Sequence, residues 1–229
     1  MIYLLAFDML PYIILHNSIS LDGSLINFNV NMDIHYQIAS SYKPDAHLIG
    51  SKTIKTGIEQ YGSAPQEESK DFIKPERDSN LPYWIIIDTK GTLKGLLHEV
   101  RRFEFCKDFV IFISQDTPKD YINYLEKRNY DFHIVGKKNI DLDTSFKILS
   151  DKYNVKKILT DTGKILGNLL INNGFVKEIS LLVHPVIVGK KSYNIFESIN
   201  KNIGLKLFRY DIIDKDFIWL TYKVDNTKN

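Results

Sequence analysis

The chain has 229 residues, 44% of them hydrophobic, which is enough material for one large core. Its 30 basic and 28 acidic side chains leave a formal net charge of +2, which excludes the overall basic field of many nucleic-acid-binding and membrane-surface proteins. The single cysteine, Cys106, excludes an internal disulfide framework, fits a reducing compartment and lies in no metal-ligand spacing. We therefore expect one cytoplasmic domain over residues 1–229, without a metal and with any anion site formed locally.

The first residues of the chain are apolar, but they include Asp8 and lack a basic start. Neither a signal peptide nor a membrane span fits such a segment. We interpret residues 1–11 as a short N-terminal extension that forms an extra edge strand or a subunit contact, because an apolar segment must be buried somewhere.

Apolar runs with strand character alternate with segments of helical period along most of the chain. Strands that alternate with helices form a largely parallel sheet with helices on both faces, so the sequence predicts an α/β fold. The strand runs are Tyr12–Leu15, His47–Ile49, Trp84–Ile87, Phe109–Ile113, Phe132–Val135, Ile158–Leu159 and Ile179–Val188.

Three helices have recognisable boundaries. The segment Thr117–Asp120 combines a capping residue, a proline at the first helical position and an acid at the third. A second helix is expected over about Asp143–Tyr153, and a third runs through Leu166–Leu170 and ends before Gly174. The polar, proline-containing stretch Gly62–Leu81 has no apolar period and is interpreted as a loop.

The end of the chain has a different pattern. Leu205–Ile213 and Phe217–Val224 are two long strand patterns joined by three polar residues, which predicts an antiparallel hairpin at the edge of the sheet. Apolar residues lie on both alternating faces of this hairpin. One face is therefore expected to contact a second copy of the chain, which predicts a homodimer.

Three segments place glycine and small polar residues directly after a predicted strand, where ligands bind in parallel α/β sheets. Asn17–Gly23 offers hydroxyl and carboxylate groups to a flat heterocycle, or is an ordinary turn. Gly50–Thr53 and Thr160–Lys164 each place a glycine before a predicted helix, whose free N–H groups can hold phosphate. Neither the Rossmann spacing nor the P-loop pattern occurs, so a dinucleotide would need a different cradle.

In this order, the three segments resemble the reductase domain of bacterial riboflavin-biosynthesis proteins and its stand-alone archaeal and fungal relatives. The first signature of that family is an asparagine and an S-L-D-G run, matched by Asn17 and Ser20–Gly23. The second is a glycine and a threonine three residues later, matched by Gly50 and Thr53. The third is an acidic residue with a glycine pair, a leucine-rich helix, G-L-V-D-E and P-V-x-x-G; it corresponds to Asp161–Gly163, Gly174–Glu178 and Pro185–Gly189.

The resemblance implies a dihydrofolate-reductase-like fold, with NADPH lying across the carboxyl ends of the strands. Its diphosphate would lie at Thr162, Gly163 and Lys164, and the residues Gly50 and Thr53 would contact the same cofactor. Thr89 and Lys90 are candidates for the 2′-phosphate, which a cation and a hydroxyl suit, or they form a solvated turn.

The implied reaction is hydride transfer to the ribosyl group of a phosphoribosylaminopyrimidine in riboflavin biosynthesis. Asn17, Ser20 and Asp22 would contact the substrate. Asp22 and Asp161 are the candidate catalytic carboxylates, although either could equally order water.

Two departures from the family pattern keep other functions open. Thr162 and Asp161 stand where the family has a glycine and a glutamate, which leaves room for a catalytically inactive nucleotide-binding relative. The family's arginine-containing segment for the substrate phosphate is missing, which leaves room for a reductase of another heterocyclic imine such as a dihydropterin. The cations that could replace the missing arginine are Lys55, Lys70, Lys74 and Arg77.

Overall fold

The computed structural model describes residues 10–61 and 66–225, which form two compact units. One unit consists of Met1–Pro11 and Asp45–Lys156, and the other of Tyr12–Pro44 and Lys157–Asn229. Residues 1–9 of the expected N-terminal extension lie outside the described residues. The single domain over residues 1–229 stays a prediction, and the two units are described in turn.

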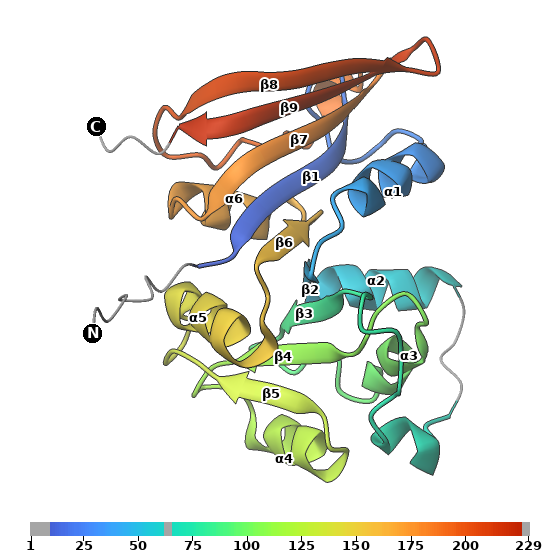
Figure 1. Cartoon of the computed structure of the whole chain (residues 1–229), viewed down its shortest axis with the longest axis vertical. Helices are drawn as coiled ribbons and strands as arrows, with labels where there is room; N and C mark the ends of the chain where they lie inside the picture. Colours follow the sequence, from blue (N-terminus) through green and yellow to red (C-terminus); the bar gives the residue numbers. More distant parts are fainter. Residues whose placement is uncertain (1–9, 62–65, 226–229) are drawn as a thin grey trace, which may run out of the picture. The chain divides into compact units, whose positions relative to one another are not determined.

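Four parallel strands form the sheet of the first unit, in the order β5-β4-β3-β2 (Figure 1). Gly50, the last residue of β2, pairs with Ile87 of β3, and Ile87 pairs with Phe112 of β4. The carboxyl ends of these three strands therefore lie along one edge. The strands are β2 (Ala46–Gly50), β3 (Tyr83–Ile87), β4 (Phe109–Ile113) and β5 (Asp131–Ile134).

Helices cover both faces of this sheet. Three of them, α2 (Ser51–Tyr61), α3 (Leu97–Arg102) and α4 (Lys119–Lys127), share one core with Phe109, Ile111 and other apolar residues. The fourth, α5 (Leu142–Tyr153), covers the opposite face, where the Tyr153 hydroxyl lies 2.9 Å from Nε2 of His133. A short 3-10 turn, η1 (Ser69–Phe72), lies in the segment expected to be a loop, and its other described residues form no helix or strand.

The second unit has a sheet of five strands in the order β6-β1-β7-β9-β8 (Figure 1). The central strand β1 is parallel to β6 and β7, whereas β9 is antiparallel to β7 and to β8. The last two strands are the expected C-terminal hairpin. The strands are β1 (Tyr12–Ser20), β6 (Lys157–Thr160), β7 (Val176–His184), β8 (Gly204–Ile213) and β9 (Phe217–Asp225).

Two helices lie on opposite faces of the second sheet. On one face, Ile34 and Ile38 of α1 (Met32–Ser41) pack with buried Leu182 and Trp219. On the other face, α6 (Lys164–Asn172) approaches β1 so closely that a Cβ at Gly167 would lie 3.5 Å from the Leu15 side chain. Another 3-10 turn, η2 (Gly189–Lys191), follows β7. The expected α/β fold, with a mostly parallel sheet and an antiparallel C-terminal hairpin, is thus confirmed.

Two boundaries that the sequence predicted are wrong. The strand expected over Ile179–Val188 ends at His184, because Pro185 has no N–H group for the next ladder position. The first strand is longer than expected and continues through Ser20, so Asn17 and Ser20 are strand residues rather than parts of a turn.

The expected helix cap at Thr117 is also wrong. α4 begins at Lys119, and Pro118 is its N-cap without a side-chain hydrogen bond. The Thr117 hydroxyl instead donates to the carbonyl of Thr89 at 3.0 Å and accepts from the Ser114 amide. It therefore joins the turn after β3 to the turn after β4.

The longest helix of the described ranges, α5, has 12 residues. Among the described residues no helix is both long enough and apolar enough to cross a membrane.

Candidate active site

In the first unit, the candidate cofactor residues follow the carboxyl ends of β2 and β3. β2 ends at Gly50 and α2 begins at the next residue, so Thr53 lies exposed in the first turn of that helix. A Cβ added to Gly50 would meet no heavy atom within 4 Å. Gly50 therefore faces open space at the point where a ligand would approach the helix N-terminus.

The turn after β3 is held by hydrogen bonds to a buried carboxylate. The buried carboxylate of Asp88 accepts hydrogen bonds from the backbone amides of Thr92 and Leu93, each at 2.9 Å. Gly91 has φ +68° and lies against the ring of Tyr121, at a place where a Cβ would come within 2.8 Å. Only Lys90 is exposed at the tip of this turn, so its ammonium group is presented to solvent.

In the second unit, the segment 161–163 connects β6 directly to α6. Gly163 is the N-cap residue of α6, and no side chain caps the helix. A Cβ at Gly163 would also meet nothing within 4 Å. The first N–H groups of α6 are thus left without a side-chain acceptor, as in helix termini that bind anions.

Thr162, which replaces a glycine of the resembling family, fits its position without strain. Its φ is not positive, so the backbone does not need a glycine there. Its side chain is buried, and its hydroxyl lies 3.1 Å from the hydroxyl of Thr160. Thr162 is therefore accommodated in this turn without backbone strain.

Asn17 ties β1 to this turn. Its amide nitrogen donates to the carbonyl of Asp161 at 3.1 Å and lies 3.4 Å from that of Thr162. Its amide oxygen is buried and has no hydrogen-bond partner in the structure. A buried acceptor without a donor is costly, so it marks a place that a ligand donor can occupy.

Lys164, the first residue of α6, is paired with an acidic residue. Its ammonium group pairs with the carboxylate of Glu197 and lies 3.8 Å from the centre of the Tyr193 ring. Glu197 thus offsets the charge that the sequence assigned to a diphosphate, and this neighbour lies too far along the chain to be visible in the local motif.

Asp22 connects the turn after β1 to the segment after β7 in the second unit. Its carboxylate accepts hydrogen bonds from the Ser20 hydroxyl at 2.6 Å and from the amides of Val188 and Gly189 at 3.1 and 2.9 Å. These donors, the Ser20 hydroxyl first, lower the pKa of Asp22 to about 2. Asp22 is therefore an anion at neutral pH, and Ser20 orients it.

Asp161 has a neighbour that the sequence did not single out. Its carboxylate lies 3.8 Å from Nε2 of His35 in α1. The His35 side chain is 7% exposed and that of Asp161 is 28% exposed, so the carboxylate links a buried histidine to the surface. Asn31, whose side chain accepts from the Ile34 amide, caps α1 and is the sequence signal that could have found this helix.

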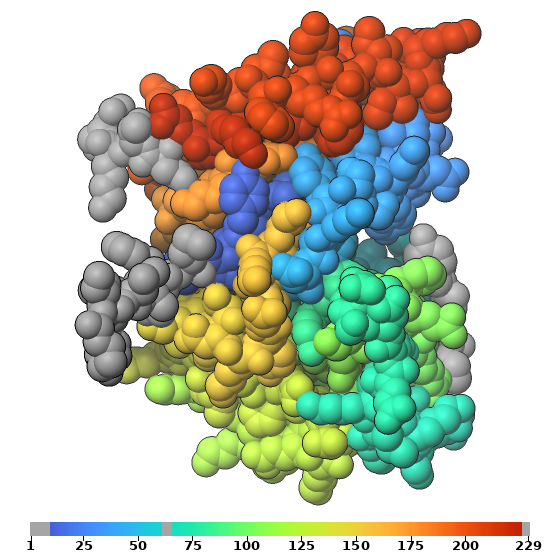
Figure 2. All heavy atoms as spheres, viewed as in Figure 1, coloured from blue at the N-terminus to red at the C-terminus, as the bar shows by residue number. Residues whose placement is uncertain are grey.

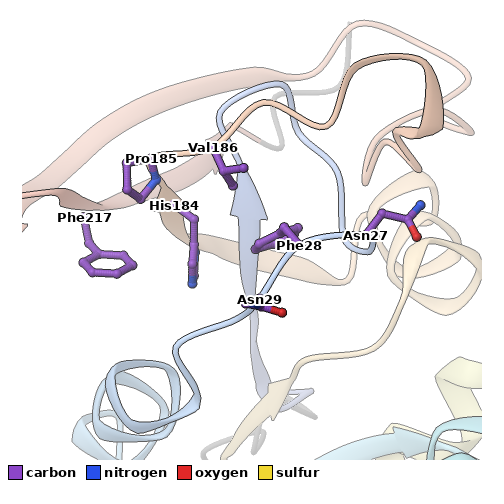
Figure 3. Close-up of a pocket in the computed structure, with 7 residues that line it drawn as sticks. All are labelled: Asn27, Phe28, Asn29, His184, Pro185, Val186 and Phe217. Carbon is purple, nitrogen blue, oxygen red and sulfur yellow. The ribbon is translucent and has the colours of Figure 1, made fainter.

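A shallow pocket of about 690 Å³ lies at the ends of β7 and β9 in the second unit. Figure 3 shows His184 beside Phe217, with Phe28 facing them from the loop before α1. The Nε2 atom of His184 accepts from the Asn31 amide at 3.0 Å, and burial lowers the pKa of this histidine. No predicted site residue lines the pocket, and its lining includes the packed rings of Phe28, His184 and Phe217.

With this geometry described, the sequence can be compared with known families. Residues 11–218 match the RibD C-terminal domain family. The chain belongs to this family.

Several solved structures share the fold of this chain. A pyrimidine reductase-like protein of Corynebacterium diphtheriae superposes with a TM-score of 0.72 at 16% identity, covering 94% of this chain and 92% of that one. A riboflavin biosynthesis reductase of Saccharomyces cerevisiae gives 0.68 at 17% identity, with 94% and 90% covered. A bifunctional deaminase/reductase of Thermotoga maritima gives 0.63 at 14% identity, with 94% of this chain and 57% of that chain covered. The dihydrofolate-reductase-like fold that the resemblance implied is thereby confirmed.

The cations considered for the substrate phosphate are all engaged by neighbouring groups. Arg77 donates to three backbone carbonyls, those of Arg101, Phe103 and Cys106, near the end of α3. The three lysines considered as substitutes for the missing arginine each pair with an acid: Lys55 with Glu59, Lys70 with Glu68 and Lys74 with Asp131. Arg77 thus serves the structure of α3, and none of the four cations is held ready for a phosphate.

Proposed function

We propose that this chain is an NADPH-dependent reductase that transfers a hydride to the ribosyl group of a phosphoribosylaminopyrimidine. The observation that carries the proposal is the turn at Asp161–Gly163. It combines an uncapped helix N-terminus, open space at the glycine and a buried free acceptor on Asn17. Membership of the RibD C-terminal domain family supports the same reaction.

Each unit, taken by itself, has residues suited to part of a dinucleotide. The N-terminus of α6, with Thr162, Gly163 and Lys164, is suited to a diphosphate, because its free N–H groups and the helix dipole favour negative charge. Gly50 and Thr53 form a similar helix start, and Thr89 and Lys90 present a hydroxyl and a cation suited to a 2′-phosphate.

The chain's own residues would bind the substrate and control one proton. NADPH, when bound, supplies the hydride. The ribosyl carbon accepts it, the bond from that carbon to the ring oxygen breaks, and the ring oxygen takes up a proton. We assign Asp161, whose partly exposed carboxylate lies at the turn, to ordering the water molecule that delivers this proton.

Asp22 has a different part in this proposal. With a pKa of about 2 its carboxylate is ionised and cannot deliver a proton near neutral pH. We assign Asp22, with Ser20 and Asn17, to substrate binding, in which its carboxylate accepts hydrogen bonds from substrate hydroxyl groups. Asp22 also holds the segment after β7 against the turn after β1.

The test begins with titrations of NADPH and NADH, followed by thermal shift. A ligand that binds only the folded state raises the apparent stability, so stabilisation by several degrees, stronger for NADPH, is expected. The variant Lys90→Gln should lose the preference for NADPH and keep the response to NADH. Consumption of NADPH is then compared for a phosphoribosylaminopyrimidine and for dihydrofolate. No thermal response to either nucleotide would overturn the proposal.

A second candidate function, reduction of a dihydropterin or another heterocyclic imine, is favoured by the engaged guanidinium of Arg77. It predicts turnover of dihydrofolate and none of the ribosylated substrate. A catalytically inactive relative would bind NADPH and reduce neither; the unstrained backbone of Thr162 argues against it.

We also propose a homodimer formed through the C-terminal hairpin. The side chains of β8 and β9 that point away from Trp219 leave an apolar face uncovered, and hairpin atoms lie at the surface in Figure 2. A face of this kind is suited to a second copy. Sedimentation velocity should give a dimer for the wild type and a monomer for Ile212→Lys; a monomeric wild type at micromolar concentration would contradict it. The exposed apolar residues of this face are Leu205, Leu207, Tyr210, Ile212 and Ile218.

A further inference from the structure

His35 is a buried histidine near the start of α1, and neighbouring residues contact both its ring and its backbone. Its Nδ1 atom lies 3.0 Å from the hydroxyl of Ser18 on β1. Its ring stacks on that of His16, with the centroids 4.5 Å apart and the planes at 27°. Its backbone carbonyl lies 3.2 Å from Nε2 of His16. These contacts leave Nε2 of His35 as the atom that faces Asp161.

The hydrogen-bond chain behind His35 fixes the protonation of its neighbour His16. The carbonyl of His35 can only accept, so Nε2 of His16 carries a proton and donates it to that carbonyl at 3.2 Å. Burial lowers the pKa of His16 to about 3, so the ring is neutral near pH 7 and its Nδ1 atom accepts from the Ser180 hydroxyl at 2.9 Å. The Ser180 oxygen in turn accepts from the indole N–H of Trp219 at 2.9 Å.

The neutral His16 on β1 packs against His35 and is itself held by Ser180 on β7, which binds Trp219 on β9. The exposed end of the chain of contacts is the carboxylate of Asp161, which belongs to the proposed cofactor turn. The separation of 3.8 Å is an ion-pair distance rather than a hydrogen bond. Contacts of this kind are often long in free enzymes and shorten when the ligand binds.

We propose that His35 is a positioning residue for the reductase reaction, which directs the carboxylate of Asp161 toward the substrate through its Nε2–H group. The role rests on the proposed function, because it gives Asp161 its orientation in that site. His35 itself does not touch the substrate: its side chain is almost fully buried, whereas Asp161 is partly exposed.

Two substitutions separate this role from simple packing. In His35→Gln, the side-chain amide nitrogen reaches about as far as Nε2 and keeps a donor toward Asp161. In His35→Asn, the amide reaches only as far as Nδ1, so it keeps the Ser18 partner and loses Asp161. We expect His35→Asn to lower kcat about tenfold, with the KM for NADPH changed less than threefold, and His35→Gln to recover most of that loss.

A control and a double-mutant cycle complete the kinetic test. His133→Asn removes a histidine with one hydroxyl partner in the first unit, and it should leave kcat unchanged. In an Asp161→Asn background, His35→Asn should cost no further activity, because the group on which it acts has gone. Equal losses for Asn and Gln at position 35, or the full tenfold loss in the Asp161→Asn background, would overturn the proposal.

A measurement without turnover distinguishes this inference from the proposed function. Nitrogen-15 NMR of the histidine rings should show His35 protonated at Nε2, with a resonance that shifts in Asp161→Asn and stays in place in Asp22→Asn. That result supports the positioning contact even if no candidate substrate is reduced. A His35 resonance that is indifferent to Asp161→Asn would overturn it, whatever the activity of the wild type.

Discussion

The strands β1 and β4 are both deeply buried, but they are built from different residues. All five residues of β4 are apolar, and none is more than 1% exposed. In β1, eight of nine residues are buried, yet four of these eight are polar: His16, Asn17, Ser18 and Ser20. Burying a polar group destabilises the folded state unless the group has a hydrogen-bond partner. The comparison indicates that β4 serves stability, whereas β1 carries the site.

One buried polar residue of β1, Asn17, lacks a partner for one of its polar atoms. His16, Ser18 and Ser20 have hydrogen-bond partners inside the second unit, but the amide oxygen of Asn17 has none. A fully satisfied network specifies one arrangement of side chains. A single unsatisfied acceptor next to the turn at Asp161 is instead suited to a ligand.

The largest effect on function is expected at Asp161, beside β1. Asp161→Ala should lower kcat/KM by about 100-fold or more, because the carboxylate that orders the proton-delivering water in the proposed reaction is lost. The melting temperature should change little, since the side chain is partly exposed. Steady-state kinetics and thermal unfolding of the same preparations measure both. A loss of stability that matches the loss of activity would remove Asp161 from the site and weaken the contrast with β4.

The matching change in β4 is Ile111→Ala, which should lower the stability and leave kcat/KM nearly unchanged. Ile111 is fully buried in the core of the first unit, so the cavity should cost about 2–5 kcal/mol of unfolding free energy. The protein that remains folded should keep its kcat/KM within a few fold. Denaturant unfolding measures the cost; Ile111→Val is the control, with about 0.5–1.5 kcal/mol expected. A selective loss of activity in folded Ile111→Ala would show that β4 also supports the chemistry.

The same contrast explains how much the sequence could predict. The apolar period of β4 is a local property, so Phe109–Ile113 was predicted with its correct bounds. The polar residues of β1 interrupt the apolar run after Leu15, so the strand was ended there and Asn17 and Ser20 were assigned to a turn. Partners that come from distant segments restore the strand, and a single sequence does not display them.

The site was predictable to a similar degree. The glycine turns at Gly50 and Gly163 each precede a helix, as their motifs indicated. The partners of their charged neighbours were not predictable: Glu197 pairs with Lys164, and His35 faces Asp161, from segments far along the chain. The single cysteine is buried, and burial raises the pKa of the Cys106 thiol to about 11.

The pH dependence of stability tests the polar interior of β1. The pKa of His16 is about 3 in the folded protein and 6.5 for the free side chain, so the unfolded chain binds more protons between these values. Stability is therefore complete above pH 6.5 and falls as the pH is lowered toward 3, by up to about 1.4 kcal/mol per pH unit.

The variant His16→Gln isolates this contribution. It should be less stable than the wild type at pH 7, but its unfolding free energy should fall less steeply between pH 6.5 and 4. Urea unfolding at several pH values gives both slopes. His133→Gln, outside β1, has a less buried ring and should reduce the slope by a smaller amount. Parallel curves for wild type and His16→Gln would mean that His16 is not the buried neutral group.

The smallest effect is expected at Asn17, the residue of β1 whose amide oxygen has no hydrogen-bond partner. Asn17→Ala removes the donor to the carbonyl of Asp161 and the free acceptor, and should lower kcat/KM by about tenfold, in line with the 0.5–1.5 kcal/mol of a typical hydrogen bond. Asn17→Asp, which keeps an acceptor at this position and loses the donor, separates the two roles. If the acceptor binds the ligand, Asn17→Asp retains more ligand-induced thermal stabilisation than Asn17→Ala. Equal responses of the two variants would assign Asn17 to holding the turn, and β1 would then resemble β4 in serving structure alone.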